Sequence, residues 1–136
     1  MNERMDRKKR RFGVSIPEDM AISLDFLAEK LEMDRSRIVR EALESYIRDH
    51  AHFCIPHECC GVITLASTHS LKIFEIIEEF RDVINEYSHV HTGNECVNAL
   101  IVSGPSGRIA ELHKRLMPFG NLRFIPVKNC REVDSR

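Results

Sequence analysis

The segment from Arg10 to Pro17 alternates apolar side chains with polar or small ones, and this pattern predicts a β-strand. Successive side chains of a strand point to opposite faces. The apolar side chains therefore share one face: Phe12, Val14 and Ile16. The others share the opposite face: Arg11, Gly13 and Ser15. A single strand cannot bury its own apolar face, so we expect it to pair with the same strand of a second chain.

Positive charge is concentrated at the start of the chain. The first eleven residues contain six Lys or Arg and two acidic residues, although the whole chain has a net charge of −1. A basic end on an acidic body is typical of a protein that contacts phosphate groups. A paired, two-stranded ribbon of this kind can enter the major groove of DNA.

Two amphipathic helices are expected after the strand, over residues 18–32 and 36–49. Glu18 and Asp19 suit the positive end of the first helix dipole. Ser36 can cap the second helix, and Asp34 is the alternative cap. A unit of about 50 residues has little core of its own, which also favours folding as a dimer.

The order strand, helix, helix after a basic start resembles the ribbon-helix-helix family of dimeric repressors. The resemblance implies a DNA-binding domain over residues 1–50, with the polar face of the strand against the bases: Arg11, Gly13 and Ser15. It implies phosphate contacts from the basic residues before the strand, Lys9 and Arg10. The N-terminus of the second helix would bind a further phosphate, at Arg35, Ser36 and Arg37.

Residues 51–60 are predicted to be a linker rich in metal-binding side chains: Cys54, His57, Cys59 and Cys60, with His50 and His52 just before. Thiolate and imidazole groups suit zinc, copper, nickel or an iron–sulfur cluster. The spacing does not match a standard zinc motif. The alternative is a hinge in which Cys54 and Cys59 pack as small hydrophobic residues.

Residues 61–130 are expected to form a second domain, followed by a tail over residues 131–136. Apolar periodicity predicts strands at 62–66, 88–91, 96–102 and 122–127. It predicts helices at 71–84 and 109–117, the first of them capped by Ser67 or Thr68. The resulting order β-α-β-β-α-β is that of the ferredoxin-like unit.

The expected hairpin in the middle of this domain carries a candidate metal site. His89 and His91 are two residues apart on one strand, so both rings lie on one face. A turn over residues 92–95 places Cys96 opposite His91 on the next strand. Two imidazoles and one thiolate suit nickel, copper, zinc or cobalt. No orienting carboxylate or oxyanion donor is evident, so we do not expect an enzyme.

The combination of a ribbon-helix-helix unit with this second domain and its His-Val-His…Cys hairpin resembles the NikR family of nickel-responsive repressors. The resemblance implies a tetrameric core of ACT type with a DNA-binding dimer at each end. It implies nickel bound by His89, His91 and Cys96 at a subunit interface, with a fourth ligand, a His, from the first helix of this domain in a neighbouring subunit. That helix contains no His over residues 78–82. The alternative fourth ligands are water or one of four side chains: Glu78, Glu79, Asp82 and His69.

The sequence thus predicts an α+β protein with an N-terminal ribbon-helix-helix domain and a C-terminal ACT-like or ferredoxin-like domain. We expect a cytoplasmic, homotetrameric, nickel-dependent repressor of a palindromic DNA operator. The alternatives are a regulator that senses zinc, cobalt or copper, or one that senses an organic effector. No apolar run reaches the ~18 residues that a membrane span requires, so no membrane partner is expected.

Overall fold

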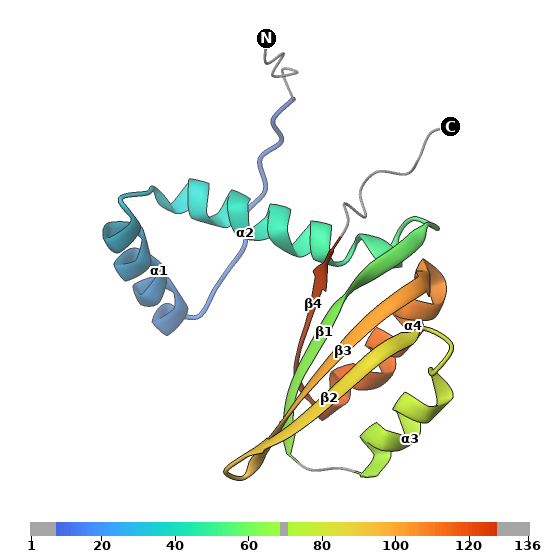
Figure 1. The fold of residues 1–136 in the computed structure, drawn as a ribbon. Coiled ribbons are helices and arrows are strands. Elements are labelled where there is room, and N and C mark those ends of the chain that lie inside the picture. Colours follow the sequence, from blue (N-terminus) through green and yellow to red (C-terminus); the bar gives the residue numbers. More distant parts are fainter. Residues whose placement is uncertain (1–7, 69–70, 128–136) are drawn as a thin grey trace. The chain divides into compact units, whose positions relative to one another are not determined.

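The chain divides into two compact units, one ending at Glu41 and the other beginning at Ala42. The computed structural model describes residues 8–68 and 71–127. The predicted tail and the first seven residues, including Arg4 and Arg7, lie outside the described residues. Two helices, α1 (Glu18–Leu31) and α2 (Arg35–Asp49), match the two predicted near the N-terminus (Figure 1). No helix within the described ranges is long and apolar enough to cross a membrane.

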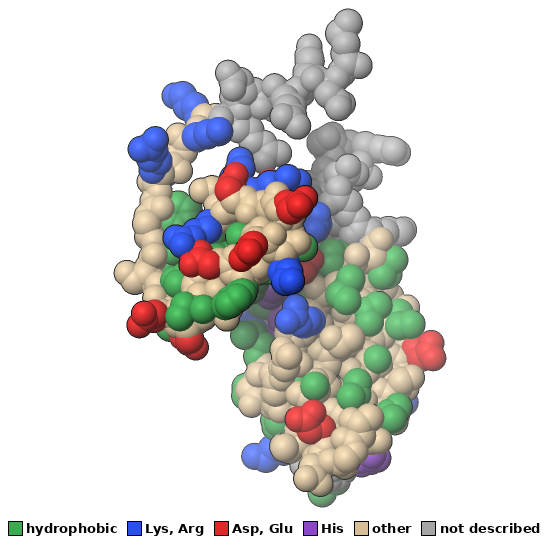
Figure 2. All heavy atoms as spheres, turned by 90° about the vertical axis from the view of Figure 1, so that its left-hand side faces the viewer, with side chains coloured by type: hydrophobic (Ala, Val, Ile, Leu, Met, Phe, Trp, Pro, Cys, Tyr) green, Lys and Arg blue, Asp and Glu red, His purple; other side chains and the backbone are tan. Residues whose placement is uncertain are grey.

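The first unit has no buried apolar core. Neither α1 nor α2 contains a buried residue, and the apolar side chains of Phe12 and Val14 are 73% and 72% exposed. Residues 8–17 form neither helix nor strand, because a β-ladder needs a second strand and the single chain provides none. Figure 2 shows hydrophobic, basic and acidic side chains all at the surface here. This unit therefore needs a partner to bury its apolar face.

The start of α2 is set by Asp34 and not by Ser36. The Asp34 carboxylate accepts a hydrogen bond of 2.7 Å from the Arg37 backbone N–H, which is a helix cap. Ser36 lies inside the helix, so the expectation that it caps the helix is wrong. The Arg35 guanidinium pairs with Asp25, which ties the start of α2 to α1.

The second unit has the predicted order β-α-β-β-α-β. Its elements are the 3-10 turn η1 (Ala51–Phe53), β1 (Glu58–Thr68), α3 (Leu71–Glu79), β2 (Ile84–Thr92), β3 (Glu95–Pro105), α4 (Ser106–Leu116), the 3-10 turn η2 (Met117–Phe119) and β4 (Gly120–Pro126). The sheet order is β2-β3-β1-β4, and every neighbouring pair is antiparallel. The α+β fold class is therefore confirmed.

Several predicted boundaries differ from the structure, among them the start of β1 and the end of α3. Strand β1 begins at Glu58, four residues early, because it pairs along its whole length with β3. Helix α3 ends at Glu79, and a turn closed by the bond from Val83 N–H to the Phe80 carbonyl leads into β2. Ile84 therefore belongs to a strand. Ser67 and Thr68 lie in β1, so the expectation that either caps α3 is also wrong.

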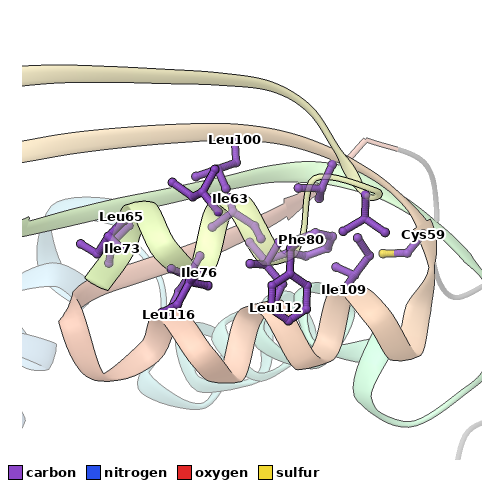
Figure 3. Packing of buried hydrophobic residues seen from close by; sticks show 14 residues of the cluster. Cys59, Ile63, Leu65, Ile73, Ile76, Phe80, Leu100, Ile109, Leu112 and Leu116 are labelled. Atoms are coloured by element: carbon purple, nitrogen blue, oxygen red, sulfur yellow. The ribbon is translucent and has the colours of Figure 1, made fainter. Parts of the chain in front are cut away.

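The hydrophobic core lies between the sheet and the helices α3 and α4, which cover the same face (Figures 1 and 3). Its largest fully buried apolar side chains come from β1, β3, β4, α4 and the turn after α3: Ile63, Leu65, Phe80, Leu100, Ile109, Leu112, Leu116 and Phe124. The opposite face of the sheet is also apolar. Val62 on β1 is paired with Ile101 on β3 and with Ile125 on β4, and these two isoleucines are exposed. The described helices leave this second face open.

A pair of buried histidines joins η1 to α4. His52 Nε2 lies 3.1 Å from His113 Nδ1, and both side chains are almost fully buried. Burial lowers the pKa of both to about 4, and the neighbouring His113 and His50 contribute further to the shift at His52. The rings pack against the aromatic rings of Phe53 and Phe124. Both histidines are therefore neutral at pH 7.

Because of the buried pair His52 and His113, we expect the second unit to lose stability in mild acid. Between pH 6.5 and about 4 the unfolded chain binds more protons than the folded chain, because folding lowers the pKa of both histidines. The contribution of the two neutral histidines to the free energy of unfolding is fully present above pH 6.5. It is lost as the pH falls toward 4, by up to about 3 kcal/mol per histidine. Urea unfolding of metal-free protein at pH 7.5 and 4.5 measures this loss. The double variant His52→Gln/His113→Gln is the control, and an equal pH dependence in that variant would contradict the assignment.

Candidate metal centre

The hairpin between β2 and β3 sets the geometry of the candidate site. Its register pairs Thr92 with Glu95 and His91 with Cys96, so the turn itself consists of two residues. Gly93 takes a φ of +64°, a conformation that glycine adopts without steric cost. The structure thus places Cys96 opposite His91, as the sequence predicted.

The three predicted ligands converge. His89 Nε2 lies 3.2 Å from His91 Nε2, and Cys96 Sγ lies 3.4 Å from His91 Nδ1. All three ligand atoms lie within 4.8 Å of one another. Among residues 8–68 and 71–127, this is the only group of three such side chains close enough to share an ion. Cys96 is 2% exposed, whereas His91 is open to solvent.

A buried amide, Asn98, orients His89. The Asn98 Nδ2 donates to the backbone carbonyl of Leu65, so its Oδ1 is an acceptor. This oxygen accepts hydrogen bonds of 2.7 Å from His89 Nδ1 and from the Tyr87 hydroxyl. The proton of His89 is therefore on Nδ1, and the lone pair of Nε2 points toward His91. An outer partner that fixes a histidine tautomer is typical of protein metal sites.

The sequence interpretation missed Asn98, although a signal was present. Asn98 is two residues after Cys96 in an otherwise apolar strand, so it shares a face with that thiol. The register places it directly opposite His89. A polar residue at a core position opposite a candidate ligand indicates a supporting role.

The donor set fits a borderline or soft divalent metal. Two neutral imidazoles and one thiolate are ligands that nickel, copper, zinc and cobalt accept. The site is preorganised, because a short hairpin holds the thiol and the nearer imidazole, and Asn98 holds the other imidazole. The residues therefore fit a metal ion, with one or more positions left for further ligands.

The four predicted ligands of the linker are not brought together. Cys59 and Cys60 are adjacent on β1 and therefore point to opposite faces, and Cys59 is buried in the hydrophobic core. Cys54 is exposed, and the His57 Nδ1 bonds to the backbone carbonyl of Ile55. Within the described chain, no group of three candidate ligands includes any of them. Cys59 therefore packs as a small hydrophobic residue, as the alternative to a metal site predicted.

The carboxylates considered as a fourth ligand are all paired with arginines. Glu78 binds Arg81 at 2.6 Å, Glu79 binds Arg115 at 2.8 Å, and Asp82 binds Arg108 at 3.2 Å. Hydrogen bonds from these arginines lower the pKa of each carboxyl group. None of them joins the described cluster of His89, His91 and Cys96. His69 lies outside the described residues.

The predicted DNA contacts fall into two groups. One group lies on the exposed N-terminal segment: Lys9, Arg10, Arg11, Gly13 and Ser15. The other lies at the start of α2, where Arg37 pairs with Glu41 and Arg35 pairs with Asp25. The Asp34 cap already uses the Arg37 N–H, so the expectation that this amide is free for phosphate is wrong. The amides of Arg35 and Ser36 precede the capped position.

Because Asn98 orients His89, we expect a change of Asn98 to lower the affinity of the site for nickel. Asn98→Leu removes the acceptor for His89 Nδ1, so we expect the affinity for Ni(II) to fall by about 10- to 100-fold. Asn98→Asp keeps a carboxylate oxygen in the same place and should retain most of the affinity. Competition with a chromophoric chelator measures both. Wild-type affinity in Asn98→Leu would show that Asn98 does not support the site.

Comparisons with known proteins match both units. Residues 8–51 match the family described as ribbon-helix-helix domain, and residues 60–127 match the NikR C terminal nickel binding domain. These matches confirm the DNA-binding class of the first unit and nickel as the metal of the domain family. The family consists of transcriptional regulators, which confirms the expectation that the chain is not an enzyme.

Curated relatives agree over most of the chain. A protein of Thermococcus kodakarensis named as a nickel-responsive regulator is 32% identical over 114 residues, which is 79% of this chain and 83% of that protein. The protein of the same name from Thermococcus onnurineus is 30% identical over 79% of this chain and 83% of its own length. That of Methanopyrus kandleri is 31% identical over 78% of this chain and 80% of its own length. This chain belongs to the NikR family of nickel-responsive transcriptional regulators.

Proposed function

We propose that this chain is a nickel-dependent repressor that binds a palindromic operator as a homotetramer. The convergence of His89, His91 and Cys96 within 4.8 Å carries the proposal, because it supplies a metal site in a chain that also has a DNA-binding domain. The metal-responsive regulation of transcription follows from the family. The sign of the regulation, the operator symmetry and the assembly are the proposed parts.

The DNA-binding half would work as a two-chain ribbon. Phe12 and Val14 are exposed in the single chain, and pairing with the same segment of a second chain would cover them. The opposite face, with Arg11, Gly13 and Ser15, would then lie in the major groove. Arg11 can bind guanine through two hydrogen bonds, whereas Gly13 brings no side chain and allows close approach. A two-fold ribbon implies an operator built of two related half-sites.

The second unit would provide the tetramer core, in the manner of an ACT-type domain. Its open sheet face carries the paired row of Ile101, Val62 and Ile125, which a single chain leaves without cover. Apolar surface of this kind favours association with another copy. A tetramer joins two DNA-binding dimers and so fixes the spacing of two half-sites. We place its action in the cytoplasm, where operator DNA is available.

Control by nickel would be a shift between arrangements of the tetramer. Metal binding favours DNA binding only if the DNA-competent arrangement has the higher affinity for the metal. His89, His91 and Cys96 would hold the ion. The three carboxylates considered for the fourth position are engaged by arginines, which favours water or a ligand outside the described ranges.

The second candidate is a regulator that senses zinc, cobalt or copper through the same hairpin. One observation favours it: residues 78–82, at the end of α3 and in the turn after it, include no His. A site completed by water or another oxygen ligand suits zinc or cobalt better than square-planar nickel. An organic effector is the remaining alternative, and the convergence of three metal ligands speaks against it.

A matched pair of variants tests which cluster is the sensor. His91→Ala removes a hairpin ligand, so we expect this variant to bind less than one nickel per chain. We also expect nickel no longer to change its operator affinity, whereas coupling between sites typically changes an affinity at least ~5-fold. Cys54→Ser/Cys60→Ser removes the two linker thiols outside the core and should leave both properties intact. Metal analysis and fluorescence anisotropy with operator DNA measure them. The opposite pattern would assign the sensor to the linker.

A second pair of variants distinguishes side chains that bind bases from side chains that bind phosphates. Arg11→Ala should cost about 1–3 kcal/mol of operator binding and relax the preference for one base, because Arg11 lies on the predicted base-reading face. Lys9→Ala should weaken binding to all sequences alike and lower the salt slope by about one, because it removes one cation that neutralises a phosphate. Titrations at several salt concentrations with operator and scrambled DNA distinguish the two. Identical behaviour of both variants would contradict the assignment.

A further inference from the structure

Ser67 is a buried polar residue beside the candidate metal site. It lies on β1, directly opposite Cys96 of β3, and its side chain is on the core face of the sheet. The residue is 5% exposed, and in the described part of the chain its hydroxyl oxygen has no hydrogen-bond partner. A buried hydroxyl without a partner destabilises the fold, so its presence needs a reason.

Within residues 8–68 and 71–127, the fold gives Ser67 no structural role. Helix α3 begins at Leu71, four residues later, so Ser67 cannot be its N-cap. The neighbouring positions on the same face of β1 are Ile63 and Leu65, which are fully buried apolar residues. A small apolar residue would fill the same place without burying a polar group.

Of the two residues paired with Ser67 across the sheet, only Cys96 has a side chain. On the other side, the partner of Ser67 on β4 is Gly120, which has no side chain. A Cβ at Gly120 would lie 2.1 Å from the Ala66 carbonyl oxygen, so the close approach of the two strands excludes any side chain there. The only directly opposite side chain is therefore that of Cys96. Cβ atoms of such a pair are about 4.5–5.5 Å apart, and rotation of the serine side chain brings its hydroxyl within hydrogen-bond reach of the sulfur.

We propose that Ser67 is a positioning residue of the metal centre, whose hydroxyl donates a hydrogen bond to the Cys96 sulfur when that sulfur is a metal-bound thiolate. This inference rests on the proposed function, because it concerns the same three ligands. A thiolate is a stronger acceptor than a thiol, so metal binding supplies the partner that the hydroxyl lacks. Asn98 supports the imidazole of His89, and Ser67 supports the thiolate in the same way.

The hydrogen bond has two expected effects on the bound metal. It stabilises the charge on sulfur, which raises the metal affinity. It also lowers the energy of the sulfur lone pairs, so the thiolate-to-nickel charge-transfer band lies at shorter wavelength. A merely structural role would not shift this band in Ser67→Val while leaving it unchanged in Ser67→Thr, whose side chain has nearly the same shape.

Three variants of the full chain test the proposal. Ser67→Ala and Ser67→Val remove the hydroxyl, and Ser67→Thr keeps it in a side chain of nearly the same shape as Val. With Ni(II) as the probe, we expect Ala and Val to shift the charge-transfer band to longer wavelength and to lower affinity roughly tenfold. Thr should keep the wild-type band. The Val and Thr pair controls for the added volume, and Ala controls for a failure of either to pack.

The outcomes are distinct. A band at the wild-type wavelength in both Ser67→Ala and Ser67→Val would overturn the role of Ser67. A shift of equal size in Ser67→Thr and Ser67→Val would assign the effect to packing and would also overturn it. Failure of the wild-type protein to show a thiolate-to-nickel band would instead contradict the proposed metal site itself.

Discussion

The pairing of β2 with β3 across a two-residue turn is the constraint on which the metal centre depends. Because strand side chains alternate, a slip of one residue would turn Cys96 away from His91 and move Asn98 away from His89. The separate pairing of β3 with β1 places Cys96 opposite Ser67. These two strand pairings together bring the candidate ligands His89, His91 and Cys96 to one place, with Asn98 and Ser67 on the strands beside them. The sheet is held in turn by the core beneath it, where α3 and α4 pack on the same face.

Within the described residues, each of the two units has apolar side chains at its surface. In the first unit the apolar face of the N-terminal segment is exposed, and in the second the open side of the sheet carries Ile101 and Ile125. Burial of such surface is the main driving force of association, at about 25 cal/mol per Å². This exposed apolar surface is the observation that supports the proposed assembly. It also explains how a metal bound to one unit can affect DNA bound to the other, since both are joined through the same helix α2.

Much of the fold and of the candidate site could be predicted from residue patterns, and the failures have physical causes. The β-α-β-β-α-β order and the opposition of His91 and Cys96 follow from periodicity and a short turn. The cap at Asp34, and not Ser36, depended on local backbone geometry that the sequence of two candidates two positions apart cannot reveal. Cys59 and Cys60 resembled linker ligands because the pairing that extends β1 to Glu58 involves residues 47 positions away at Pro105. Asn98 and Ser67 gain meaning only from cross-strand register, which depends on the whole sheet.

The central claim is that one thiolate and two imidazoles of the β2–β3 hairpin hold the metal. X-ray absorption spectroscopy at the nickel edge, on the full-length protein loaded with one nickel per chain, tests it most directly. We expect one sulfur neighbour at bonding distance and at least two nitrogen neighbours with the multiple-scattering pattern of imidazole. A first shell without sulfur, or one with two or more sulfurs, would contradict the claim. Two or more sulfurs would place the metal at other cysteines of the chain.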